Sequence, residues 1–199
     1  MTDTAPATSS TDAPTSADLG QPWSIRLLAD AFDRVAEALP GTVEGLDSAG
    51  ILWQPDPAAN SIGWLLWHLA RVEDDHLAGV ALATGSGSGA QVWLTDGWAA
   101  RFALPYPDAA IGYGQTATDV AAFDVGDADA LLGYYDAVHA RTSAIVGALP
   151  ESALDVVVDD RWDPPVTAAV RLVSVVNDTT AHVGQAAYVL GLVERRDAH

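Results

Sequence analysis

Residues 60–76 read NSIGWLLWHLARVEDDH, and the first ten of them, residues 60–69, form the most apolar stretch of the chain. Asn60 and Ser61 supply good N-cap chemistry, and apolar residues then recur at helical spacing to about Ala83. His68 lies inside this apolar helix. A lone histidine in such a place is ordinarily a core residue whose ring nitrogens are hydrogen-bonded. Whether His68 binds a ligand therefore depends on which residues of the other helices face it.

Three further segments show helical periodicity. They cover about residues 23–39, residues 128 or 130 to 149, and about residues 167–193. Pro40-Gly41 and Pro150 end the first two, and Pro164-Pro165 precedes the third. Residues 154–158 are the single short candidate for a strand. Four helices, each with a stripe of core residues, predict an all-α fold, a four-helix bundle.

The last of these helices carries a polar stripe. Its members recur every three or four residues among apolar neighbours: Arg171, Ser174, Asp178, His182 and Gln185. A helix this apolar is expected to be largely buried, so the stripe needs either a hydrogen-bond network or an ion. Asp178 and His182 are four residues apart, and a carboxylate and an imidazole so placed are a common metal half-site.

His68 would complete that half-site if it faces the last helix. Two imidazoles and one carboxylate leave positions open for water or substrate, an arrangement typical of catalytic zinc. Arg171 and Gln185 are candidates for substrate binding on the same stripe. Arg171 would pair either with an anionic group of a ligand or with an aspartate at the edge of the core. We expect His76 to be solvated or to support the ligands.

The connection between the second and third helices is long, roughly residues 84–126. It begins with GSGSG and continues with six aromatic residues: Trp93, Trp98, Phe102, Tyr106, Tyr113 and Phe123. A loop this aromatic seldom lacks structure. We expect residues 91–113 to fold over the metal end, with Trp93 and Trp98 lining the substrate pocket; plain core packing is the alternative.

Composition narrows the class of function. The formal charge is −18 and lysine is absent, so the surface repels phosphate backbones and anionic lipids and predicts neither nucleic acid nor membrane as a partner. Without cysteine, any thiol must come from outside the chain. Residues 1–20 resemble a disordered tail and no signal peptide, and residues 21–199 form one domain. No apolar run reaches membrane-spanning length, so we expect a cytoplasmic protein.

The chain resembles the DinB-like helical-bundle superfamily. The matching stretches are NSIGWLLWHLARVEDDH (60–76), QVWLTDGWAARFALP (91–105), GYG (112–114), YYDAVHART (134–142), WDPPVTAAVRLVSVVND (162–178) and HVGQAAYVLGL (182–192). They are most similar to an actinobacterial branch that includes mycothiol S-transferases and the N-terminal domains of mycothiol-dependent maleylpyruvate isomerases.

This resemblance implies a metal ion on His68, Asp178 and His182. The superfamily usually has His-xxx-His on the fourth helix, whereas here Asp178 takes the first position, as in the acid-xxx-His pair of the isomerases. The resemblance implies a divalent ion, zinc first, with nickel, manganese and iron open. It further implies that the ion activates a cofactor thiol such as mycothiol.

We therefore expect a metal-dependent thiol S-transferase that adds a low-molecular-weight thiol to an electrophilic small molecule. A hydrolase that uses metal-activated water is one alternative. A non-catalytic module that binds a metal or a small molecule is the other. The sequence leaves open whether the chain forms a homodimer.

Overall fold

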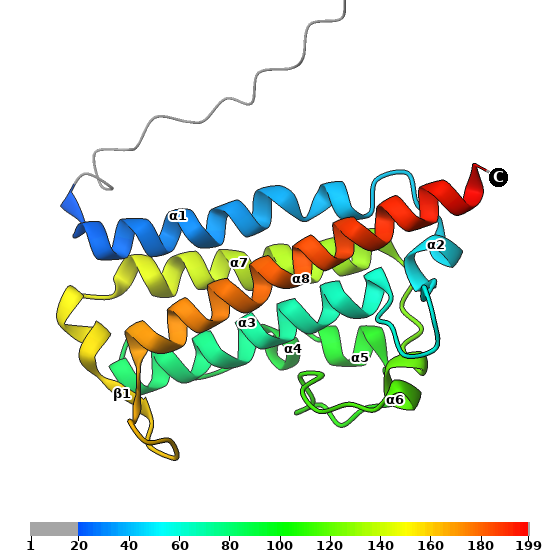
Figure 1. Cartoon of the computed structure of the whole chain (residues 1–199). Coiled ribbons are helices and arrows are strands. Elements are labelled where there is room, and N and C mark those ends of the chain that lie inside the picture. Colours follow the sequence, from blue (N-terminus) through cyan, green and yellow to red (C-terminus); the bar gives the residue numbers. More distant parts are fainter. Residues whose placement is uncertain (1–19, 199) are drawn as a thin grey trace, which may run out of the picture.

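A computed structural model describes residues 20–198 of the chain. The predicted disordered tail, residues 1–20, lies outside the described residues except for Gly20, as does His199 at the end of the predicted domain. Figure 1 shows the described part as a set of long helices with shorter elements at their ends and along one side.

Four long helices make up most of the structure. They are α1 (Trp23–Ala38), α3 (Ile62–Thr84), α7 (Ala128–Ala148) and α8 (Ala168–Asp197). Both α3 and α1 pack against α7 and α8, so the four lie side by side (Figure 1). The predicted all-α class is thus confirmed, and each long helix begins within two residues of its predicted start.

The helix boundaries follow from local side-chain chemistry. The Ser61 hydroxyl accepts the backbone N–H of Trp64 at the start of α3, and Gly85 ends the helix in the left-handed conformation at φ 71°. Asp127 caps α7 and Thr167 caps α8 in the same way as Ser61. Because the N-terminal caps are local contacts, the sequence was sufficient to predict where these helices begin.

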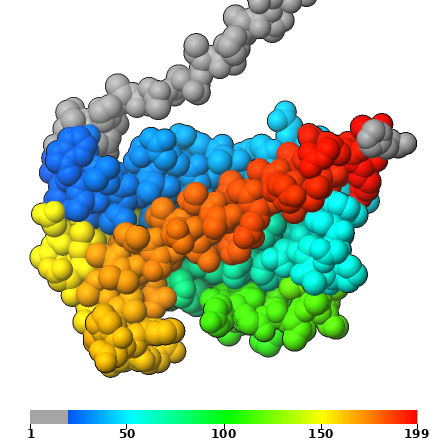
Figure 2. All heavy atoms as spheres, viewed as in Figure 1, coloured from blue at the N-terminus to red at the C-terminus, as the bar shows by residue number. Residues whose placement is uncertain are grey.

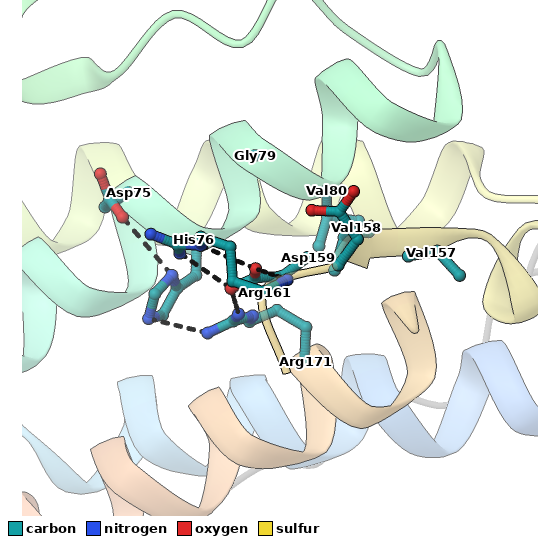
Figure 3. A pocket seen from close by; sticks show the side chains of 10 residues that line it. Asp75, His76, Gly79, Val80, Val157, Val158, Asp159, Arg161 and Arg171 are labelled. Atoms are coloured by element: carbon teal, nitrogen blue, oxygen red, sulfur yellow. Dashed lines mark hydrogen bonds and ion pairs between the residues drawn. The ribbon is translucent and has the colours of Figure 1, made fainter. Parts of the chain in front are cut away.

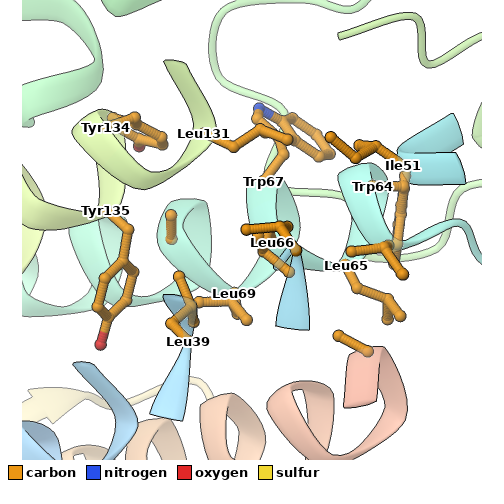
Figure 4. Packing of buried hydrophobic residues seen from close by; sticks show 14 of the residues in the cluster. Leu39, Ile51, Trp64, Leu65, Leu66, Trp67, Leu69, Leu131, Tyr134 and Tyr135 are labelled. Carbon is orange, nitrogen blue, oxygen red and sulfur yellow. The ribbon is translucent and has the colours of Figure 1, made fainter. Parts of the chain in front are cut away.

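The helix α3 lies at the centre of the molecule. Its side chains are buried from Ile62 to Asp74, over more than three turns. Figure 4 shows Leu66 and Leu69 of α3 in the same cluster as Leu39 at the end of α1 and Tyr135 of α7. Any polar group on this part of α3 therefore meets protein rather than bulk water.

The connection from α3 to α7 folds into short helices. These are α4 (Val92–Thr95), α5 (Trp98–Phe102) and α6 (Ala117–Ala121). Figure 2 shows the connection, in green, packed along the side of the long helices. The remaining short elements are η2 (Pro40–Thr42), α2 (Ser48–Leu52) and η3 (Glu151–Asp155).

A two-stranded sheet precedes α8. Its strands β1 (Val157–Asp159) and β2 (Val166–Thr167) pair antiparallel, with Val157 opposite Thr167. The predicted strand at residues 154–158 overlaps β1 only in part, because the chain up to Asp155 is a 3₁₀ turn. Within the described residues, no helix combines the length and apolarity that crossing a membrane requires.

The expectation that the last helix is largely buried was wrong. The side chains of Val170 and Val173 on α8 are 52% and 60% exposed, because α8 packs through one face and the other faces outward. On α3, by contrast, the charged residues Arg71, Glu73 and Asp74 are all buried. Neither outcome can be read from apolar content alone.

Candidate metal centre

The structure brings His68, Asp178 and His182 together between α3 and α8. One ligand atom from each lies within 4.8 Å of the others. On α8, His182 Nε2 is 3.6 Å from Asp178 Oδ1, one turn away. The His68 ring meets the His182 ring nearly edge-on, with 4.8 Å between the ring centroids.

Each imidazole is oriented through its Nδ1 atom. His68 Nδ1 contacts the carbonyl oxygen of Ile111, and His182 Nδ1 lies 2.9 Å from Gln185 Oε1. Both partners are acceptors, so Nδ1 carries the hydrogen and the lone pair is left on Nε2. A metal-binding histidine usually donates the N–H of its other ring nitrogen to an acceptor of this kind, which fixes the tautomer and the orientation of the ring.

The donor set fits a divalent ion. Asp178 Oδ2 is buried and has no hydrogen-bond partner among the described residues. An unpartnered buried carboxylate oxygen is costly, and a cation beside it would remove that cost. Two imidazole nitrogens and one carboxylate oxygen are ligands that zinc commonly takes in catalytic sites.

The electrostatics favour the ligand forms of two of the three residues. Burial lowers the pKa of His68, which keeps its ring neutral. Burial tends to raise the pKa of Asp178, but its hydrogen bond to His182 and the nearby imidazoles outweigh this and lower it. The hydrogen bond to Asp178 raises the pKa of His182, so a proton would compete there with a metal ion.

A cavity of about 210 Å³ adjoins two of the three residues, His68 and Asp178. Its lining includes His68, Asp178, Ile111 and Tyr113, and Tyr113 is 90% exposed. The site therefore has an open side toward solvent. His76, which we expected to be solvated or to support the ligands, lines this cavity from about two turns beyond His68 on α3.

His76 also lines a larger cavity of about 480 Å³, shown in Figure 3. There Arg171 Nη2 donates to Asp159 Oδ2 at 3.0 Å, and Arg171 Nη1 lies 3.4 Å from His76 Nε2. Arg161 also pairs with Asp159, and mainly this hydrogen bond holds the pKa of that carboxyl well below its usual range. Of the two roles predicted for Arg171, the structure shows the salt bridge to an aspartate at the edge of the core. The same side chain also borders the cavity.

The other candidate residues occupy different places. Trp93 is 3% exposed and packs against Phe102 and Tyr134. Trp98 packs against the same two rings. Both tryptophans thus follow the alternative of plain core packing, not that of lining the substrate pocket. The aromatic connection reaches the centre instead through Ile111 and its neighbours. Gln185 supports His182 and also borders a separate cavity beside Tyr188.

Sequence reasoning missed the part played by the backbone of the connection. A carbonyl oxygen such as that of Ile111 leaves no trace in residue type. One signal was available in the GYG stretch, because a glycine is needed where the chain passes very close to a ring. A Cβ atom on Gly112 would lie 2.5 Å from His68 Nδ1.

Comparisons with known proteins agree with this fold. A family model described as the DinB superfamily matches residues 31–186. The crystal structure of a conserved protein from Enterococcus faecalis is 33% identical, with a TM-score of 0.75, and the match covers 84% of this chain and 95% of that one. No curated protein matches the chain. Members of the matched superfamily are typically metal-binding helical proteins. The chain belongs to the DinB superfamily.

Proposed function

We propose that this chain is a metal-dependent transferase, built on a four-helix bundle, that adds a low-molecular-weight thiol to an electrophilic small molecule. Mycothiol is the thiol that we propose. The observation that carries the proposal is the convergence of His68, Asp178 and His182 beside a cavity that opens to solvent. Three protein ligands are the number that catalytic zinc sites use, which leaves one position for a substrate atom.

A divalent ion held by these residues would lower the pKa of a bound thiol and present it as the nucleophilic thiolate. The chain itself contains no cysteine, so no internal thiol competes for the ion or for the electrophile. Zinc is the ion that we propose, because two imidazoles and one carboxylate suit it. Nickel, manganese and iron accept the same ligands.

The surrounding residues provide for binding. The cavities of about 210 and 480 Å³ share His76, so together they offer room for the body of a thiol cofactor. Arg171 presents its guanidinium to the larger cavity, where it would meet an anionic group of the ligand. Burial, followed by the charge of Arg171, lowers the pKa of His76, so this ring is neutral at pH 7.

The test is a thiol-depletion assay on zinc-loaded protein with electrophilic small molecules. Mycothiol should be consumed only when both the protein and the metal are present, and His182→Ala should abolish the reaction. Glutathione in place of mycothiol measures how specific the protein is for its thiol. Turnover of the electrophile in the absence of any thiol would contradict the proposal and indicate metal-assisted hydrolysis.

A further inference from the structure

Three side chains on one face of α3 donate hydrogen bonds to a single segment of the connection, residues 110–115. Trp64 Nε1 donates to Gln115 Oε1 at 2.8 Å, and Arg71 Nε donates to the carbonyl of Ala110 at 3.1 Å. Between them, His68 Nδ1 donates to the carbonyl of the next residue along, Ile111. Spacings of four and three residues place all three donors on the same side of the helix.

Arg71 is fully buried and is held in place by other partners. Its Nη2 donates to Gln91 Oε1 at 3.0 Å, and its Nη1 is 3.4 Å from Asp74 Oδ2. Asp74 in turn accepts the backbone N–H groups of Val92 and Trp93 at the start of α4. One guanidinium thus ties α3 both to the beginning of the connection and to the carbonyl that precedes Ile111.

Gly112 lets the segment approach the ring of His68. It has φ 90°, and an added Cβ would lie 2.5 Å from His68 Nδ1 and 3.0 Å from the Trp64 ring. Gly114 has a similar φ of 74°, but a Cβ there would meet nothing within 4 Å. Substitution at either position strains the backbone, whereas only substitution at Gly112 pushes the segment away from His68.

We propose that residues 110–115 form a clamp that sets the orientation and tautomer of His68, with Arg71 and Trp64 as positioning residues for the metal centre. The clamp fixes Ile111 so that its carbonyl oxygen accepts a hydrogen bond from Nδ1–H of His68. The Nε2 atom of His68 then faces Asp178 and His182. This inference rests on the metal site of the proposed function and does not depend on thiol transfer. Supporting partners of this kind change metal affinity about 10- to 100-fold in other sites.

The experiment measures Co²⁺ binding by its visible absorption and Zn²⁺ affinity by competition, in the full chain. The variants are Gly112→Ala, Arg71→Lys and the matched control Gly114→Ala. Lysine keeps the positive charge beside Asp74 but lacks the planar fork that reaches both Ala110 and Gln91. We expect about 10- to 100-fold weaker binding for Gly112→Ala and Arg71→Lys, and near-native binding for Gly114→Ala.

A second measurement separates positioning from general stability. Nitrogen-15 spectra of the histidines in metal-free protein should show His68 as the Nδ1–H tautomer in wild type and Gly114→Ala. That preference should be lost in Gly112→Ala and Arg71→Lys, even where circular dichroism shows a folded protein. If Gly112→Ala does not fold, Arg71→Lys decides.

The outcomes are distinct. Native affinity and tautomer in both Gly112→Ala and Arg71→Lys would overturn the clamp and leave the metal site standing. Equal weakening in Gly114→Ala would show that loop strain, not the contact with His68, is responsible. A wild-type protein that binds neither Co²⁺ nor Zn²⁺ would overturn the metal site itself.

Discussion

At the scale of the residue, the histidines differ in what faces their second nitrogen. His68 and His182 each have an acceptor at Nδ1, which leaves Nε2 as the nitrogen that can bind an ion, and His182 Nε2 lies 3.6 Å from Asp178 Oδ1. His139 instead pairs with Asp33 at 3.1 Å and stacks on Tyr135. Of these three rings, those of His68 and His182 can offer Nε2 to a common ion.

His182→Ala should therefore lose most of the bound metal, because two remaining ligands form a much weaker site. His139→Ala is the matched control and should keep its metal content, although its stability changes. Metal analysis after purification and dialysis measures both variants. Equal loss in the two variants would mean that the wrong histidines have been assigned.

Glu73 is a buried acid away from the metal centre. It is completely buried, its Oε2 accepts from the Tyr135 hydroxyl at 3.2 Å, and burial raises its pKa to about 7. Above its ordinary pKa the unfolded chain releases this proton while the folded protein keeps it. The free energy of unfolding therefore falls from about pH 4.5 to about pH 7 and is then constant with respect to this group.

Glu73→Gln removes that titration. The variant should be more stable than wild type above pH 7, by up to about 3 kcal/mol, and the difference should shrink toward pH 4. Urea unfolding of the two proteins across this pH range measures the difference. A difference that does not vary with pH would show that Glu73 is not held protonated by burial.

At the scale of the element, what the sequence predicted depends on how local the cause is. The four long helices were predicted because their caps and apolar stripes lie within each helix. The path of the connection was not, because contacts between distant residues fix it, such as Arg71 with Ala110 and Trp64 with Gln115. The pair Asp178 and His182 was found by its spacing, whereas the support of His68 by the Ile111 carbonyl was not predicted.

The tryptophans of the connection illustrate the same limit. A large apolar ring buries equally well in a core or in a pocket, so residue type alone did not decide between them. Trp93 is packed in the core, so Trp93→Ala should lower the free energy of unfolding by about 3–5 kcal/mol while the refolded protein keeps its metal. Chemical denaturation and metal titration measure the two effects.

Tyr113 offers the opposite case within the same element. Its ring is 90% exposed at the cavity beside the metal centre, so Tyr113→Ala should leave the melting temperature nearly unchanged. Loss of the ring should raise KM for the thiol or the electrophile with little change in metal content. If Tyr113→Ala has native kinetics, the ring takes no part in substrate binding.

At the scale of the whole molecule, the candidate metal centre lies between α3 and α8, two helices that pack together. An ion bound only by the folded state stabilises it by mass action, about 2.7 kcal/mol when the free ion is at 100 times Kd. Zinc should therefore raise the melting temperature, and a chelator should reverse the rise. His182→Ala should show no such shift; an equal shift in that variant would mean that zinc binds elsewhere.

The central claim is that one divalent ion binds to His68, Asp178 and His182, and anomalous X-ray diffraction at the zinc edge tests it most directly. Crystals of zinc-loaded protein should show one strong anomalous peak between α3 and α8. The peak should lie about 2.0–2.2 Å from Nε2 of both histidines and from a carboxylate oxygen of Asp178. A peak at other residues, or no peak at these three, would contradict the account.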